Sequence, residues 1–197
     1  MKQDRRGKGP EIARVLRDLR KEARLSVQAL GKRAGLAPST VSKIENDQIS
    51  PTYDTLLRLA DGLSVDIAEL FAGNGGMTTG RRAVTRKGQG VPHVTPQYDY
   101  EMLCNEIANK RFVPLLATIK AGDVQSFDAL LTHPGEEFVY VLEGAVELHS
   151  DLYAPLRLEA GDCCYFDSTM GHGMVRAGDT DARVLWVCSR VSAPLRT

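Results

Sequence analysis

The spacing of hydrophobic positions changes once along the chain. Up to about residue 71, apolar residues recur every three or four positions, as in Ile12, Val15, Leu16 and Leu19, with arginine and lysine on the other faces. This spacing predicts amphipathic helices. From about residue 81, apolar residues come in short runs separated by glycine, proline, aspartate and asparagine. Such runs are typical of strands in an all-β sandwich or barrel. A helical domain followed by a β domain is therefore expected.

Local signals divide the helical part into five short helices. Ser26 is expected to cap the second helix and Gly35 to end it. The third is expected over about residues 38–46. Ser50-Pro51 is expected to open the fourth, with serine as the cap and proline in the first turn. Asp66 is expected to cap the fifth, in "IAELF".

The apolar runs of the second part mark its expected strands: "RRAVTRKG", "YEMLCN", "FVPLLATIKAG", "SFDALLT", "EFVYVLEG", "AVELHS", "APLRLEAG", "CCYFD" and "ARVLWVCSR". Between the two parts, "AGNGGMTTG" has the composition of a flexible linker. The expected organisation is a basic tail over 1–10, a helical domain over 11–72, a linker over 73–80 and a β domain over 81–197.

Composition places the chain among soluble globular proteins, since 43% of its 197 residues are hydrophobic and 25% are charged. No apolar run is long enough to span a membrane, and the first residues lack the apolar core of a secretory signal. A cytoplasmic location is therefore expected. There, four cysteines without a framework spacing are expected to remain thiols, with redox sensing by the adjacent Cys163 and Cys164 as the alternative.

Charge is distributed unevenly, although the formal net charge is zero. Residues 1–72 contain 13 basic and 10 acidic side chains, whereas residues 73–197 contain 12 and 15. A basic first part suits nucleic acid, and an acidic second part suits a different partner.

The stretch "LSVQALGKRAGLAPSTVSKIENDQISPTYDTLLRLADGLSVDIAELF" resembles the phage-repressor-like (XRE) helix-turn-helix family. The similarity is carried by "STVSKIEN", the following Ser-Pro and the closing "LSVDIAELF". It implies a DNA-binding domain whose third helix enters the major groove. It also implies a homodimer on a pseudo-palindromic operator, because one such unit buries too little surface for tight specific binding.

Val41 and Ile44 share one face of the third helix and are expected to pack inside the domain. Glu45 is expected to serve the structure, since DNA would repel it. By the resemblance, bases are contacted by Pro38, Ser39, Thr40 and Lys43. The full set of expected DNA-contacting residues is Gln28, Pro38, Ser39, Thr40, Ser42, Lys43 and Asn46.

Two positions depart from the helix-turn-helix family. Val27 stands where a phosphate-contacting glutamine is usual, and the neighbouring Gln28 is the candidate substitute. Gly31 replaces a usual alanine, which costs about 1 kcal/mol of helix propensity. The alternative interpretation is a helical bundle that binds protein, as in an antitoxin.

"HPGEEFVYVLEG" and "LEAGDCCYFDSTMGHGMV" resemble the two motifs of the cupin family, which implies a double-stranded β-barrel over about residues 81–190. The residues that fit the motifs are His133, Glu137, Gly144, Gly161 and His172. The departures are Leu131 for the first histidine, Asp167 for a proline, Thr169 for a glycine and Arg176 for the final asparagine.

The retained motif residues His133, Glu137 and His172 leave three interpretations. Two imidazoles and a carboxylate have the composition of a facial triad, so a divalent transition metal is a candidate cofactor, although an inward-pointing Leu131 disfavours it. The three side chains could instead bond one another in a polar cluster. Or they could line a ligand pocket with Leu131 and Arg176, where Arg176 would bind a small anion if its strand register turns it inward rather than to the surface.

Side chains alternate along a strand, so Phe138 and Tyr140, on the face opposite Glu137, are expected on the outside of the barrel or at a subunit interface. Trp186 is expected in the core or at an interface. The favoured hypothesis is a transcription regulator. Its helical domain binds double-stranded operator DNA, and its barrel dimerises and binds a small-molecule effector, without catalysis. The alternatives are a metal-dependent cupin dioxygenase or isomerase with an attached DNA-binding domain, and an antitoxin-like module.

Overall fold

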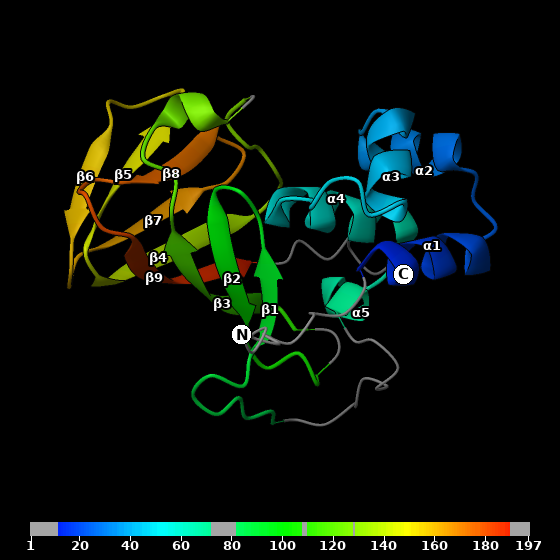
Figure 1. Cartoon of the computed structure of the whole chain (residues 1–197), viewed down its shortest axis with the longest axis horizontal. Helices are drawn as coiled ribbons and strands as arrows, with labels where there is room; N and C mark the ends of the chain where they lie inside the picture. Colours follow the sequence, from blue (N-terminus) through cyan, green and yellow to red (C-terminus); the bar gives the residue numbers. More distant parts are fainter. Residues whose placement is uncertain (1–11, 72–81, 108–109, 128, 190–197) are drawn as a thin grey trace, which may run out of the picture. The chain divides into compact units, whose positions relative to one another are not determined.

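A computed structural model describes residues 12–71, 82–107, 110–127 and 129–189 (Figure 1). By its internal contacts the chain divides into two compact units, Met1–Pro92 with Cys104–Asn109 and His93–Leu103 with Lys110–Thr197. The first unit contains the helices, and the second contains nearly all of the strands. The expected basic tail over 1–10 and linker over 73–80 lie outside the described residues.

The helical unit has the five helices that the sequence predicts, counted over the described residues: α1 (Ile12–Glu22), α2 (Val27–Ala34), α3 (Pro38–Glu45), α4 (Tyr53–Leu63) and α5 (Ile67–Phe71). Three predicted end signals are confirmed. The Ser26 hydroxyl accepts from the Ala29 N–H at 3.0 Å, Gly35 ends α2 with a φ of 62°, and the Asp66 carboxylate accepts from the Ala68 N–H at 2.9 Å.

Two features of this unit differ from the sequence-based expectation. The cap of α4 is Thr52 rather than Ser50, because the Thr52 hydroxyl accepts from the Thr55 N–H at 3.3 Å. Close packing explains why glycine replaces the usual alanine at position 31. A Cβ added to Gly31 would lie 2.8 Å from the Leu36 carbonyl oxygen, so glycine lets the turn after α2 close against the helix.

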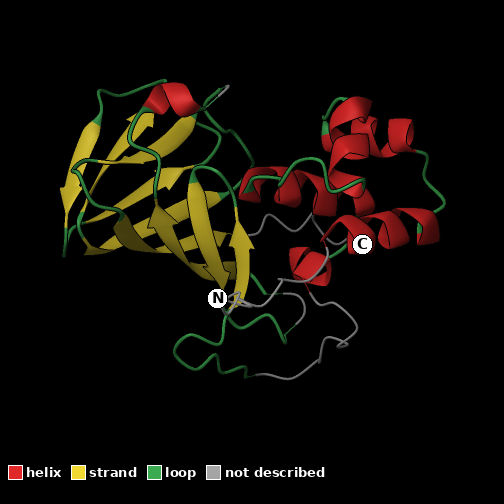
Figure 2. Ribbon diagram, viewed as in Figure 1, coloured by secondary structure: helices red, strands yellow, loops and turns green. Residues whose placement is uncertain are grey.

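The strands form two sheets (Figure 2). The larger sheet has the order β1-β2-β3-β9-β4-β7 and the smaller has the order β6-β5-β8. Their bounds are β1 (Val91–Val94), β2 (Tyr98–Met102), β3 (Phe112–Ile119), β4 (Glu136–Glu143), β5 (Ala145–Ser150), β6 (Leu156–Glu159), β7 (Cys163–Asp167), β8 (His172–Arg176) and β9 (Ala182–Ser189).

Two predicted strands are wrong. Residues 82–88 form no strand, and Val84 is 51% exposed, so this segment has no apolar face to bury. Residues 124–126 form a 3₁₀ turn, capped by the Asp123 carboxylate, and the only strand-like pairing between 126 and 132, among the described residues, is a bridge at Leu131. The strand β1 was not predicted from the sequence.

Alternating inward residues fill the barrel, as on β3, where Val113, Leu115, Ala117 and Ile119 are all buried. Tyr98 joins the two sheets. Its hydroxyl donates to the Met174 carbonyl at 2.8 Å and accepts from the Met174 N–H at 3.1 Å, which connects β2 to β8. Burial of the Tyr98 phenol raises its pKa, so it remains a donor.

Candidate functional site

The third helix, α3, presents the side chains that the sequence analysis assigned to DNA. Val41 and Ile44 are buried and fix the inner face of this helix. Thr40 and Ser42 are half-buried. The exposed members of the predicted set are Gln28 on α2, Pro38, Ser39 and Lys43 on α3, and Asn46 after it.

Glu45 anchors α3 to α1, as its expected structural role requires. Its carboxylate is only 5% exposed and accepts from Arg20 Nε at 2.5 Å and Arg20 Nη2 at 2.8 Å. Arg17 donates to the Glu45 carbonyl oxygen and, at 2.9 Å, to the Asn46 side-chain oxygen. The Asn46 amide in turn donates to the Ser42 carbonyl at 2.9 Å. The Asn46 side chain is therefore exposed but held against the domain by Arg17 and Ser42, while Ser39 and Lys43 extend from it.

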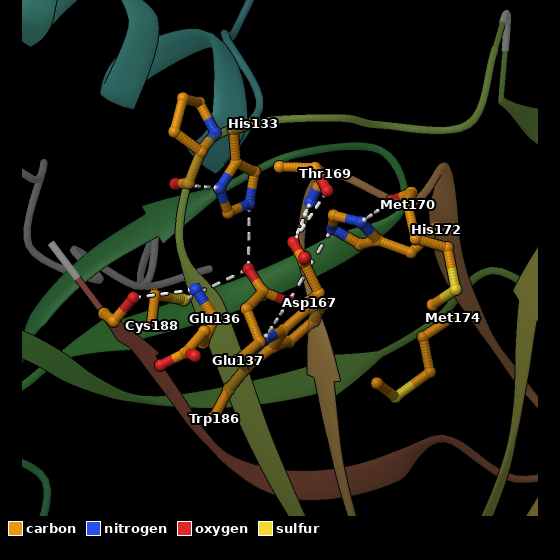
Figure 3. Close-up of polar contacts among 12 residues, drawn as sticks. His133, Glu136, Glu137, Asp167, Thr169, Met170, His172, Met174, Trp186 and Cys188 are labelled. Atoms are coloured by element: carbon orange, nitrogen blue, oxygen red, sulfur yellow. Dashed lines mark hydrogen bonds and ion pairs between the residues drawn. The ribbon is translucent and has the colours of Figure 1, made fainter. Parts of the chain in front are cut away.

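The barrel brings His133, Glu137 and His172 together at one end, where all three are buried (Figure 3). Glu137 lies on β4, His133 precedes that strand and His172 opens β8. His133 Nε2 lies 2.9 Å from Glu137 Oε1, and His172 Nε2 lies 3.6 Å from Glu137 Oε2. One ligand atom from each residue lies within 4.8 Å of the other two.

The other ring nitrogens of the two histidines contact backbone oxygens. His133 Nδ1 lies 3.2 Å from the Pro134 carbonyl and His172 Nδ1 lies 2.9 Å from the Met170 carbonyl. A carbonyl only accepts, so each Nδ1 carries the proton, and a neutral ring then presents a lone pair at Nε2. Two lone pairs aimed at a carboxylate repel it. The cluster therefore needs a proton or a metal cation at Nε2.

Two further side chains orient Glu137. Trp186 Nε1 donates to Oε2 at 2.8 Å, and the Cys188 thiol donates to Oε1 at 3.4 Å. Burial acts to raise the pKa of the Glu137 carboxyl, but the His133 hydrogen bond, the positive charge of His172 and the Trp186 N–H outweigh it, so this pKa lies below its ordinary value. Glu137 is thus an ionised carboxylate that faces two imidazoles.

Leu131 adjoins this cluster through its backbone, whereas Arg176 lies away from it. Leu131 is half-buried, and its backbone N–H and C=O both bond to His172 at 2.9 Å. Arg176 ends β8, four residues and about 13 Å along the strand from His172. Its guanidinium donates to the Lys120 carbonyl at 3.2 Å and to the Gly178 carbonyl. Its hydrogen-bonding capacity is thus partly used by the backbone.

A cavity of about 690 Å³ opens beside the cluster. It lies between the end of β5, the loop that follows and β7. Phe166 and Met170 separate it from the histidines: the Phe166 and His172 rings are 5.2 Å apart, and the Met170 carbonyl bonds His172. Its lining residues are Leu148, Ser150, Asp151, Leu152, Tyr153, Ala154, Leu156, Cys164, Tyr165, Phe166, Asp167, Thr169 and Met170.

Comparison with protein families accounts for both units. Residues 11–71 match the helix-turn-helix domain family, and residues 116–188 match the cupin domain family. The chain thus contains a helix-turn-helix domain followed by a cupin domain.

Among solved structures, this helix-turn-helix cupin protein is similar to an HTH_3 family transcriptional regulator from Vibrio cholerae, with 22% identity, a TM-score of 0.65, and coverage of 92% of this chain and 96% of that chain. It is also similar to hydroxypropylphosphonic acid epoxidase from S. wedmorenis, with 24% identity, a TM-score of 0.47, and coverage of 91% and 97%. The first likeness shows a shared fold. No curated protein matches the sequence significantly.

Several residues of the cupin barrel site were not predicted from the sequence. Trp186 was assigned to the core or an interface, but it also bonds Glu137. Alternation along β9 places Trp186 and Cys188 on one face, but only the register, which sets Cys188 opposite Glu137, brings that face to the cluster. Asp151 and Asp167 were missed as cavity residues because a loop brings Asp151 to the cavity that Asp167 also lines. No helix in the described part of the chain has the length and hydrophobicity that crossing a membrane requires.

Proposed function

We propose that this protein is a sequence-specific DNA-binding transcription regulator whose cupin barrel binds a small-molecule effector. The observation that carries the proposal is that Ser39 and Lys43 are exposed on an α3 helix that Arg20 and Glu45 fix to α1. A recognition helix needs this combination, because its contacting side chains must be free while its backbone is held rigidly. The cavity beside the buried His–Glu–His cluster supplies the place for an effector.

Replacing Lys43 with alanine is expected to weaken DNA binding about tenfold, because this exposed cation reaches either guanine or phosphate. Fluorescence anisotropy with duplexes from the gene's own upstream region measures it. A base contact relaxes sequence preference at one position, whereas a phosphate contact weakens all duplexes alike and lowers the salt dependence.

The matched control for this experiment is Lys87→Ala, which removes the same charge from an exposed position after the helices. It should leave affinity unchanged. Both variants should keep the mass of the unmodified protein in sedimentation. If Lys43→Ala binds every duplex as tightly as Lys87→Ala does, the recognition-helix assignment is wrong.

The outer face of the larger sheet supports the proposed homodimer. Phe138 faces outward between Tyr165 and Val187 on neighbouring strands, as its parity predicts. Tyr140 is 38% exposed and Tyr165 is 62% exposed. Apolar side chains gathered on one sheet face are a common basis of protein interfaces. Dimerisation through this face would pair two DNA-reading domains.

A divalent transition metal is the second proposal for the barrel, and one observation favours it: the Nε2 atoms of His133 and His172 lie 2.9 and 3.6 Å from the Glu137 carboxylate oxygens, so all three side chains converge on one point. His133, Glu137 and His172 would hold the metal, and the carbonyls that bond each Nδ1 would orient the rings. The Ser168 hydroxyl, which has no hydrogen-bond partner among the described residues, is a further buried polar group beside His133. A bound metal would supply Lewis-acid or redox chemistry, which is what the rival enzyme function needs.

Metal retention tests this second proposal. Protein loaded anaerobically with Fe²⁺, Mn²⁺ or Zn²⁺ and then dialysed is expected to keep about one ion per chain by elemental analysis, and His172→Ala is expected to lose it. His149→Ala, which removes a half-buried histidine of β5 outside the cluster, is the control and should retain the ion. Equal retention by the two variants, or none by the unmodified protein, contradicts a metal at this cluster.

A further inference from the structure

The cavity beside the cluster has the dimensions of a small-molecule site. Its volume of about 690 Å³ falls within the range of pockets that enclose metabolites. Inward residues Leu148, Cys164 and Phe166 form its inner wall, and the loop after β5 forms its rim. Because Phe166 also contacts His172, a ligand here would lie one side chain away from the polar cluster.

Charge in the cavity has one sign. Its lining contains Asp151 and Asp167 but, over the described residues, no lysine, arginine or histidine. Neither carboxylate forms an ion pair with a basic group in the described part of the chain. Hydrogen bonds from the Thr169 N–H and hydroxyl, both at 2.8 Å, lower the pKa of Asp167, so it stays ionised (Figure 3). Two unneutralised carboxylates favour a cation.

Asp151 is placed by the backbone around Gly171. Its N–H donates to the Gly171 carbonyl at 3.1 Å, and a Cβ added at Gly171 would lie 2.9 Å from Asp151 Oδ2. The glycine therefore leaves room for the carboxylate at this position. Since Gly171 directly precedes His172, the carboxylate and the buried cluster are set by the same turn.

Aromatic and aliphatic side chains make up most of the remaining lining. Tyr153 is 72% exposed and Leu152 is 68% exposed, whereas Phe166 is buried. Aromatic faces attract organic cations as well as apolar groups. A ligand with an apolar body would cover the exposed rim, and its charged end would meet the carboxylates.

We propose that this cavity binds a small organic amine in its cationic form, through Asp151 and Asp167 and the surrounding aromatic rings. Its role as the effector rests on the proposed regulatory function, whereas the binding itself does not. The charge is opposite to that of the anion expected from Arg176, which does not line this cavity.

A matched pair of probes tests whether the cavity prefers a cationic or an anionic ligand. Isothermal titration of the full-length protein with phenethylamine and with phenylacetate compares nearly the same apolar body with opposite charges. The amine is expected to bind at least tenfold more tightly. Asp151→Asn and Asp167→Asn should each weaken the amine at least fivefold, and Asp179→Asn, in an exposed turn outside the lining, should not. Equal or tighter binding of phenylacetate, or unchanged amine affinity in both cavity variants, overturns the proposal.

Cysteine labelling locates the bound amine independently of DNA. Cys164 lines the cavity and its neighbour Cys163 is exposed on the opposite face of β7. Burial raises the pKa of the Cys164 thiol, so labelling with iodoacetamide is done at mildly alkaline pH and read by peptide mass spectrometry in a Cys163→Ser background. The amine is expected to slow labelling of Cys164 severalfold and leave half-buried Cys104 unaffected. Unslowed labelling under saturating amine overturns the assignment. If Cys164 is protected but DNA affinity does not respond to the amine, the cavity assignment stands and the proposed regulation fails.

Discussion

Glu45→Gln is expected to lower the free energy of unfolding of the helix-turn-helix domain by about 2–3 kcal/mol. The change leaves the Arg20 guanidinium, whose side chain is only 13% exposed, against a neutral amide instead of a carboxylate. Removing one partner of a buried ion pair is costly because the other charge stays desolvated. Helical circular dichroism during urea unfolding measures the loss, since the α-helices of the described chain lie in this domain. DNA affinity should fall as well, because α3 loses its ion pair with α1 and keeps only the hydrogen bonds from Arg17.

The control for this change is Asp18→Asn. Asp18 lies 3.8 Å from Arg14 on α1, but these side chains are 53% and 50% exposed. An exposed pair of this kind contributes well under about 1 kcal/mol, so its loss should hardly move the unfolding curve. If the two variants lose equal stability, the buried pair does not anchor the recognition helix.

Gly144→Ala is expected to destabilise the cupin barrel by about 3 kcal/mol. Gly144 joins β4 to β5 with a φ of +74°, and a Cβ there would lie 3.1 Å from the Ala182 Cα and 3.2 Å from its Cβ. The substitution therefore adds a backbone clash to the strain of a left-handed conformation. Fluorescence of Trp186, the single tryptophan in the sequence, reports unfolding of the barrel alone.

Gly161→Ala separates the two contributions. Gly161 is the other motif glycine and has a φ of +99°, but no atom lies within 4 Å of the position that a Cβ would occupy. It should cost only the backbone strain, about 1–2 kcal/mol. A loss as large as that of Gly144→Ala would mean that contact with Ala182 contributes nothing.

Much of the helical domain could be predicted because its signals are local. Ser26, Gly35 and Asp66 act within four residues of their own position, and the spacing of Leu16 and Leu19 needs no partner to be recognised. The barrel could be predicted less fully, because its contacts join residues that are far apart in the sequence. Alternation gives the face of a strand but not its neighbour, so the pairing that brings Trp186 of β9 to Glu137 could not be inferred.

The candidate site was predicted in the same unequal way. His133, Glu137 and His172 followed from the motif spacing, and the structure does bring them together. The cavity did not follow, because Asp151 and Tyr153 belong to a loop whose path depends on the turn at Gly171. Long-range loop placement of this kind carries no periodic signal.

The double hydrogen bond between the Tyr98 hydroxyl and Met174 limits how the barrel can deform. Sliding one sheet past the other by a single residue would break both bonds at once and leave a phenol and two peptide groups unsatisfied in an apolar interior. The two sheets therefore keep a fixed register. A ligand in the cavity can be accommodated by movement of the loop after β5, but not by separation of the sheets.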